Sequence, residues 1–224
     1  MKPVFVRLSI TIIVILVTVL AYAATTNIAQ VNGTTVTGTY SNNISVAGEI
    51  NSGVVNLTTT AGKITFTNTI SSSTANLTAT TGVVLVAVST SSTVKAVSSG
   101  GNITGTTIAD SAVNINAKGG GVTISSYIRG ASNVVILATG NVIVTGTIGS
   151  TAVSPNVNLY VKTTGGTIAL NGNISNTATV KLSATGNITV ANLNNTAVLT
   201  YCTTGGTFTH GTVAAGASET SVCP

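Results

Sequence analysis

The sequence has few aromatic residues and very few charged ones. Tryptophan is absent, methionine occurs once, proline occurs three times, and 5% of the 224 residues are charged. Nucleic-acid binding needs clustered lysine and arginine, so no nucleic-acid partner is expected. Disorder is not expected either, because 43% of the residues are hydrophobic and the formal net charge is only +5.

Carboxylates are especially scarce. After residue 23 the chain contains only Glu49, Asp110 and Glu219, and its one histidine is His210. Glycoside-cleaving and calcium-binding sites need carboxylates gathered together, and a serine or cysteine nucleophile needs a histidine that an acid orients. Since these acids lie far apart in the sequence, we expect a protein that is not an enzyme and that holds no metal or cofactor.

The first 23 residues have the pattern of a secretory signal peptide. Lys2 and Arg7 form a basic start, residues 8–20 are an apolar run, and Ala21-Tyr22-Ala23 is a small-residue cleavage site. The alternative is an uncleaved anchor, but the run is short for a membrane span, which needs about 20 apolar residues. We therefore expect a secreted protein, extracellular or at the cell surface, with no membrane contact after cleavage.

There are two cysteines, Cys202 and Cys223, both near the C-terminus. In a secreted chain an even number of cysteines indicates disulfide bonding. A metal site is the rival interpretation, but two cysteines and one distant histidine lack the ligand number and spacing. We expect a Cys202–Cys223 disulfide that folds residues 211–224 back over the end of the domain.

An alternating run of apolar residues recurs about every 20 residues. The steps between the first apolar residues of successive runs are 19 or 20 residues, except for one of 26 that contains Pro155 and predicts an inserted loop at 149–158. These first residues are Ile44, Ile64, Val84, Ile103, Val122, Val142, Ile168, Ile188 and Phe208.

Alternation with period two predicts strands, and a fixed long period predicts a stack of similar units. The sequence thus predicts an all-β fold, a parallel β-solenoid of about nine coils with small apolar residues facing a narrow core. An antiparallel β-sandwich is the alternative, because it also contains short alternating strands separated by turns.

Stretches such as "ATGNVIVTGTIG" (138–149) and "SATGNITVANLN" (183–194) resemble the repeats of filamentous haemagglutinin-type surface proteins. The resemblance extends over residues 42–213 and implies a β-helix on a secreted surface protein. The chain departs from that family in its small size and in lacking a large secretion domain. Its Thr/Asn/Val-rich, charge-poor character is also similar to extracellular filament subunits of archaea.

Asparagine has two interpretations here. Asn43, Asn102, Asn141 and Asn187 precede alternating runs, and stacked at one corner they would form a ladder of amides bonded to one another. The other interpretation is N-glycosylation, since eight asparagines lie in Asn-x-Ser/Thr sequons. These eight are Asn32, Asn43, Asn56, Asn76, Asn102, Asn173, Asn187 and Asn194.

The predicted organisation is a signal peptide (1–23), an N-terminal segment (24–41), the solenoid (42–213) and a disulfide-tethered C-terminal segment (214–224). The N-terminal segment is strand-prone, with its apolar residues at Ile28, Val31, Val36 and Tyr40. It has two interpretations: an atypical first coil, or a free strand that pairs with the next subunit. The second interpretation makes it an assembly strand.

We therefore expect a secreted structural protein, a subunit of an extracellular filament or cell-surface layer that assembles with copies of itself through its termini. The alternative is a monomeric surface adhesin that binds a glycan or a surface protein. Open strand edges and an exposed core at the ends of a solenoid need caps or partners, which favours the filament.

Overall fold

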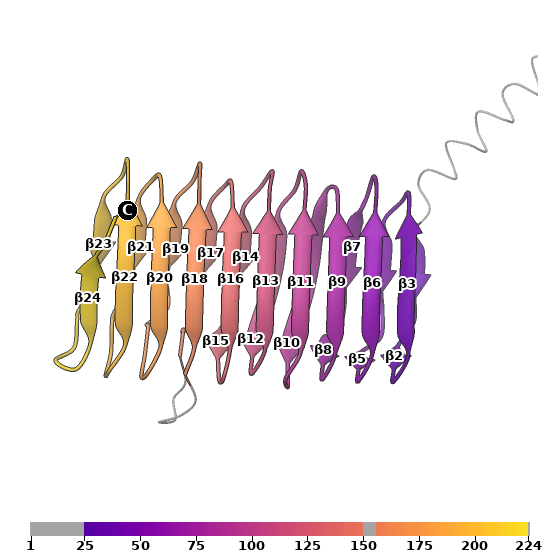
Figure 1. Ribbon diagram of the computed structural model, residues 1–224, viewed down its shortest axis with the longest axis horizontal. Coiled ribbons are helices and arrows are strands. Elements are labelled where there is room, and N and C mark those ends of the chain that lie inside the picture. Colours follow the sequence, from indigo (N-terminus) through magenta and orange to yellow (C-terminus); the bar gives the residue numbers. More distant parts are fainter. Residues whose placement is uncertain (1–24, 150–155, 224) are drawn as a thin grey trace, which may run out of the picture.

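The computed structural model describes residues 25–149 and 156–223, so the predicted signal peptide and residues 150–155 of the predicted inserted loop lie outside the described residues. The described chain winds as a regular coil whose turns lie side by side along one axis (Figure 1). Every named strand pairing is parallel, and the described residues contain no helix. The fold is a parallel β-solenoid, as predicted, and the sandwich alternative is not favoured.

One face of the solenoid, which we call the long face, is a sheet of ten strands that run across the rod (Figure 1). Each described coil contributes one strand to it, usually of six residues. In chain order these are β3 (Thr35–Tyr40), β6 (Val54–Thr59), β9 (Thr74–Ala79), β11 (Thr93–Ser98), β13 (Ala112–Ala117), β16 (Asn133–Ala138), β18 (Asn158–Thr163), β20 (Thr179–Ala184), β22 (Val198–Thr203) and β24 (Ser218–Ser221).

A second face is built from strands that alternate with these along the chain. Its ten strands belong to a 14-stranded sheet, in which they form one continuous ladder. They are β1 (Thr26–Ile28), β4 (Ile44–Val46), β7 (Lys63–Phe66), β10 (Gly82–Ser89), β12 (Ile103–Ala109), β14 (Val122–Ile124), β17 (Val142–Val144), β19 (Ile168–Leu170), β21 (Ile188–Val190) and β23 (Phe208–His210).

The third face is narrow. It contains β2 (Val31–Asn32), β5 (Ile50–Asn51), β8 (Thr69–Ser71) and β15 (Ile128–Arg129), which pair with one another or with the ends of β10 and β12. Single bridges then continue this face along the rod: Ile128 to Ile148, Ile148 to Ile174, Ile174 to Leu193 and Leu193 to Val213. One coil thus comprises a strand or bridge from each of three faces.

The stack has ten coils, one more than predicted. The extra coil is formed by residues 25–41, whose strands β1, β2 and β3 pair with β4, β5 and β6 of the same chain. The predicted count of nine began at Ile44 and left residues 25–41 open between an atypical first coil and a free strand. Their pairing within the chain shows that they form a first coil.

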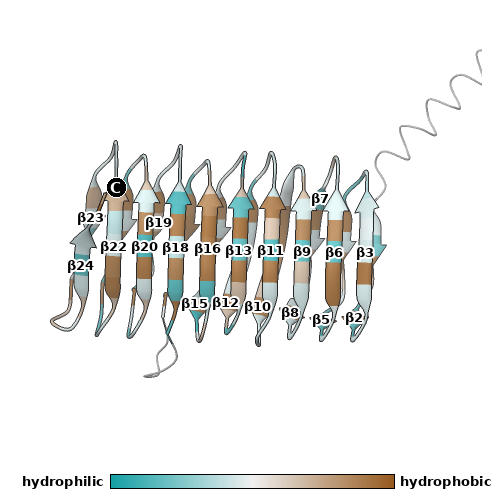
Figure 2. Ribbon diagram, in the orientation of Figure 1, coloured by the Kyte–Doolittle hydropathy of each residue, from teal (hydrophilic) through white to brown (hydrophobic). Residues whose placement is uncertain are grey.

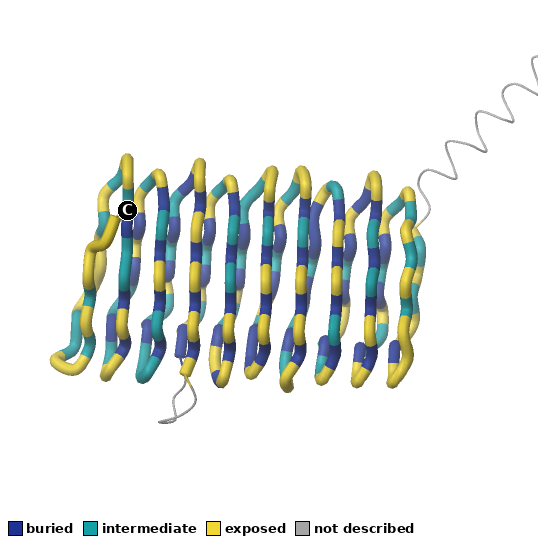
Figure 3. The backbone as a smooth tube through the Cα atoms, viewed as in Figure 1, coloured by how far each residue is buried: buried dark blue, intermediate teal, exposed yellow. Residues whose placement is uncertain are grey.

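Inward residues form columns that run along the rod axis. In one column Ile44 pairs with Ile64, and pairing continues coil by coil to Ile188 and Phe208. Buried residues alternate with exposed or partly exposed ones along the long strands from β6 to β20 (Figure 3). Hydropathy alternates less strictly (Figure 2), since Val134–Leu137 of β16 are apolar throughout. Burying one such valine or isoleucine side chain contributes about 1.5–3 kcal/mol, so the period-two pattern fixes which face of each strand points inward.

The predicted register was wrong by one residue in the fourth coil. Ile64 pairs with Val83, which is fully buried, rather than with the predicted Val84, which is only partly buried. A shift of one residue reverses the two faces of a strand, so Leu85 points inward although the predicted register placed it outward. Because Val83 and Val84 are adjacent and equally apolar, the hydropathy pattern of the sequence fits either register of this strand.

The turn that leads into the long face uses left-handed backbone conformations. Non-glycine residues with positive φ are found there, including Ser52, Ser72, Asp110 and Asn195. Gly33 and Gly130 occupy the equivalent turn in their coils, with φ of 58° and 70°. Glycine adopts this conformation without steric cost, while Asn, Asp and Ser tolerate it through local hydrogen bonds. This explains why small polar residues recur before the long strands.

The predicted asparagine ladder is wrong in its bonding. Asn43, Asn102, Asn141 and Asn187 do lie at one corner, but each Oδ1 accepts the backbone N–H of the next coil, from Lys63, Gly121, Thr167 and Thr207, at 2.8–3.0 Å. Because these asparagines do not occupy adjacent coils, they cannot bond to one another. Amide-to-amide bonds occur elsewhere, for example from Asn192 Nδ2 to Asn173 Oδ1.

Adjacent glycines at one turn provide a test of the coil spacing. A Cβ added at Gly101 would lie 1.7 Å from the backbone oxygen of Thr81 in the preceding coil, whereas one at Gly100 would lie 3.1 Å from that of Thr80. We expect Gly101→Ala to lower the free energy of unfolding by about 1–3 kcal/mol, the usual cost of overpacking, and Gly100→Ala to cost clearly less. Chemical denaturation measures both, and equal effects would contradict the coil spacing described here.

Candidate functional site

The two ends of the rod differ from its middle because their strands have a partner on one side only. At the N-terminal end, β1, β2 and β3 pair with the second coil, and no described strand covers their other edge. At the C-terminal end the same holds for β23 and β24. Unpaired strand edges are templates for pairing with another chain. These two ends are therefore the candidate functional surfaces.

The N-terminal end presents apolar side chains. Val31 is buried, while Ile28, Val36 and Tyr40 are partly buried and pack against the core. All four are residues of the predicted assembly strand, and each stands in an inward column, for example Val36 beside Val55. The structure therefore places the four residues in one coil, at the open end of the rod.

Tyr40 covers part of the N-terminal end. A Cβ built on Gly38 would lie 2.4 Å from the Tyr40 hydroxyl oxygen and 2.5 Å from a ring carbon, so the ring lies over the position where a side chain of residue 38 would stand. Gly38 pairs with Leu57, which faces the core. The aromatic ring therefore takes the place of an inward side chain at this end.

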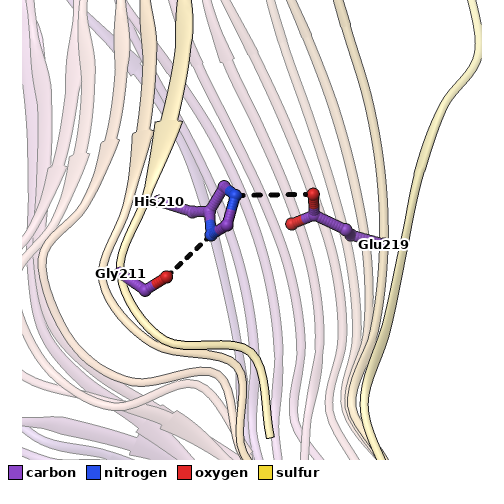
Figure 4. A network of polar contacts seen from close by, with 3 residues as sticks. All are labelled: His210, Gly211 and Glu219. Atoms are coloured by element: carbon purple, nitrogen blue, oxygen red, sulfur yellow. Dashed lines mark hydrogen bonds and ion pairs between the residues drawn. The ribbon is translucent and has the colours of Figure 1, made fainter.

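The C-terminal end carries polar side chains at inward positions. His210 pairs with Val190, and Glu219 pairs with Leu199, both of which are buried. The His210 Nε2 atom lies 3.5 Å from Glu219 Oε1, with 34% and 28% of the two side chains exposed (Figure 4). Two apolar columns of the core thus end on a histidine–carboxylate pair, whereas the column of Ile44 ends on Phe208.

Further contacts hold this pair in place. The His210 Nδ1 atom lies 2.7 Å from the backbone oxygen of Gly211 (Figure 4). The ring of Phe208 stacks on Tyr201 with centroids 3.6 Å apart, and it lies 5.4 Å from the His210 ring. The second carboxylate oxygen of Glu219 is buried with no hydrogen-bond partner in the described part of the chain. Aromatic rings and the histidine–carboxylate pair thus occupy this end, while the strand edges of β23 and β24 stay unpaired in the described chain.

The predicted disulfide is present, with Cys202 bonded to Cys223. The C-terminal segment does not fold back over the end as expected. Its residues Ser218–Ser221 form β24, which pairs in parallel with β22 and so continues the long face. The disulfide therefore ties the last coil to the preceding one along the rod axis.

The predicted glycosylation sequons are spread over the surface. Five of their asparagines are exposed and three are partly exposed: Asn32, Asn43, Asn76, Asn102 and Asn187 in the first group, and Asn56, Asn173 and Asn194 in the second. Asn56 and Asn76 lie side by side on the long face, where Asn76 Nδ2 donates to Asn56 Oδ1 at 2.8 Å.

The scarce acidic residues lie on different coils. Glu49 lies between β4 and β5, Asp110 follows β12, and Glu219 is in the last coil. Residues 25–149 and 156–223 contain no cluster of three or more histidine, cysteine, aspartate or glutamate side chains suited to hold a metal ion. In the same residues, no helix has the length and hydropathy needed to cross a membrane.

Comparisons of this chain with protein-family models, with curated proteins and with solved structures found no match. The fold defines the class, a parallel β-solenoid of ten coils, in which only the C-terminal end places a histidine and a carboxylate at inward positions.

The disulfide predicts a measurable reinforcement of the last coil. The two cysteines are 21 residues apart in sequence, and closing a loop of this size contributes about 3 kcal/mol in the chain-entropy model. We expect the double variant Cys202→Ala/Cys223→Ala to lose hydrogen-exchange protection in β24, while β13 in the middle of the rod keeps its protection. Reduction of the unchanged protein should reproduce this pattern. Unchanged exchange in β24 would show that the disulfide does not hold the last coil.

Proposed function

We propose that this protein is a secreted structural subunit of an extracellular filament or cell-surface layer. Copies join end to end, with the N-terminal coil of one stacked on the C-terminal coil of the next. The observation that carries the proposal is that both terminal coils leave the edges of their strands unpaired within the described chain.

The regular spacing of the coils favours this contact. Stacking in the internal register sets β1 beside β23 and β3 beside β24 of the neighbouring copy, as parallel strands about 4.8 Å apart. Such pairing adds main-chain hydrogen bonds, as in β-augmentation. Because the two surfaces are different and the contact repeats along the rod axis, the assembly is an open filament instead of a closed ring.

The side chains at the contact between two copies, which we call the joint, limit its stability. In this register His210 lies beside Ile28 and Glu219 lies beside Val36 of the next copy. Inward-pointing charged groups are a known means of protecting sheet edges, and burying a carboxylate together with a polar imidazole costs desolvation energy that their mutual contact only partly recovers. The joint is therefore weaker than the contact between two internal coils, and assembly depends on concentration.

The sequence resemblance to filamentous haemagglutinin-type repeats, and more loosely to archaeal filament subunits, supports an extracellular structural role. The nearly uncharged flanks of the rod, rich in hydroxyl and amide groups, suit a subunit whose solubility depends little on salt. A monomeric adhesin is the outcome that remains if end-to-end assembly fails.

The first test uses electron microscopy of residues 24–224, which include the whole described solenoid. Deleting residues 25–41 is a poor test, because it exposes the equally open edge of the second coil. Instead, Val36→Glu places a carboxylate at an inward position of the N-terminal end. An unpaired charge costs several kcal/mol to bury between two copies. We therefore expect this variant to need a more than tenfold higher protein concentration for assembly. The unchanged protein should form rods in multiples of about 48 Å.

The matched control is Val54→Glu, which adds the same charge at an exposed outward position of β6. This variant should assemble like the unchanged protein. Single rods from the unchanged protein at every concentration would end the filament proposal and direct attention to binding screens for an adhesin.

A second prediction concerns the opposite end. Replacing the pair by the residues of the preceding coil, His210→Val together with Glu219→Leu, extends the apolar columns to the last coil. We expect longer rods, because the joint then buries apolar side chains without desolvating charges. Light scattering against concentration measures the effect. Shorter rods from this variant would mean that the pair bonds to the neighbouring copy and strengthens the joint.

A further inference from the structure

Three sequon asparagines occupy the same corner of the solenoid, where the long face ends and the second face begins. Asn43, Asn102 and Asn187 directly precede β4, β12 and β21, at equivalent positions of the second, fifth and ninth coils. All three are exposed. We refer to these three residues as the corner stripe.

The amide groups of the corner stripe have a defined orientation. Each Oδ1 accepts a backbone N–H from the next coil, at 2.9 Å for Asn43, 2.8 Å for Asn102 and 3.0 Å for Asn187. Only the oxygen of an amide accepts a hydrogen bond, so the donor identifies the oxygen and fixes the position of Nδ2. Among the described residues, no hydrogen bond is formed by Nδ2 of these three asparagines.

We propose that the corner stripe is a row of N-glycans. The sequons are completed by Ser45, Thr104 and Thr189. In the modification, Nδ2 attacks C1 of an oligosaccharide carried on a lipid phosphate. A C1–N bond forms, the C1–O bond to the phosphate breaks, the phosphate leaves with the electron pair, and Nδ2 loses one proton. Because Oδ1 carries the contact between coils, the modified side chain keeps its structural hydrogen bond.

The sequons on the long face are less suited to this modification. Asn76 Nδ2 donates to Asn56 Oδ1 at 2.8 Å, and Asn56 Nδ2 donates to Thr37 Oγ1 at 3.3 Å. A sugar on either nitrogen removes one N–H donor from this chain of bonds. The two asparagines lie on adjacent strands, about 4.8 Å apart, so two oligosaccharides would overlap there.

The spacing of the corner stripe avoids that crowding. Asn43 and Asn102 are three coils apart and Asn102 and Asn187 are four, which is about 14 and 19 Å along the rod. None of the three lies in a terminal coil, so glycans at these positions leave both ends of the rod bare. The inference rests on secretion of the chain and not on end-to-end assembly.

The experiment is glycopeptide mass spectrometry of the full chain, produced with its own residues 1–23 in a secretory host that performs N-glycosylation. We expect glycans on Asn43, Asn102 and Asn187, and no molecule that carries glycans on both Asn56 and Asn76. The proposal is overturned if the protein carries no sugar on the corner stripe. This holds both for a chain that is not secreted and for a chain that is secreted without glycans. Molecules doubly modified at Asn56 and Asn76 would overturn the steric argument.

Asn141 supplies a matched control within the same corner. Its Oδ1 accepts the Thr167 N–H at 2.9 Å, in the geometry of the corner stripe, but the following residues Val142 and Ile143 do not complete a sequon. Asn141 should therefore be unmodified, and Ile143→Thr, at a partly exposed position, should add one glycan there. Failure of Ile143→Thr to gain sugar while the corner stripe is modified would show that this corner geometry does not select the site.

Two further variants separate the sugar from the hydrogen bond. Thr104→Ala removes the Asn102 sequon and leaves its side chain, so the protein should lose one glycan mass and keep its denaturation midpoint once all samples are deglycosylated. Asn102→Ala should lose the same glycan mass and also lower the midpoint, since the Gly121 N–H loses its acceptor. Equal midpoints for the two deglycosylated variants would contradict the structural role of Oδ1.

Discussion

The whole structure depends on one geometric constraint: each coil must place its backbone and its inward side chains directly beside those of the next coil. Parallel pairing in register along three faces satisfies the backbone hydrogen bonds of a coil with its two neighbours. The same pairing lines up the inward residues, so that isoleucine stands beside isoleucine or valine along a column. A register shift of one residue, from Val83 to Val84, would point the inward side chains of that strand toward solvent.

The corners of the coil follow from the same constraint. Backbones of adjacent coils approach so closely that a Cβ at Gly101 or Gly146 would lie within 2 Å of a carbonyl oxygen. Where the chain also turns sharply, small polar residues adopt left-handed conformations, and corner asparagines bond to backbone N–H groups of the next coil. The glycines and asparagines at the corners thus serve the stacking of the coils, and Asn43, Asn102 and Asn187 remain exposed at the surface.

A stack of similar coils leaves strand edges unpaired at both ends, and the two terminal coils of this protein place different side chains there. The N-terminal coil presents Ile28 and Val36 in the apolar columns, with Tyr40 lying across Gly38. The C-terminal coil places His210 and Glu219 in those columns and adds a covalent tie to the preceding coil. This difference gives the two ends of the rod distinct surfaces, as the proposed end-to-end assembly requires.

The sequence by itself determined the fold class, the 20-residue period, the disulfide and most inward positions, because alternation and period are local and every internal coil repeats them. It did not decide whether residues 25–41 form a first coil or a free strand, or which of Val83 and Val84 faces the core. Only the tertiary structure decided that corner asparagines bond to backbone, that β24 extends the sheet, and that His210 meets Glu219. Each of these depends on which residues of separate coils become neighbours, and that follows from the three-dimensional path of the chain.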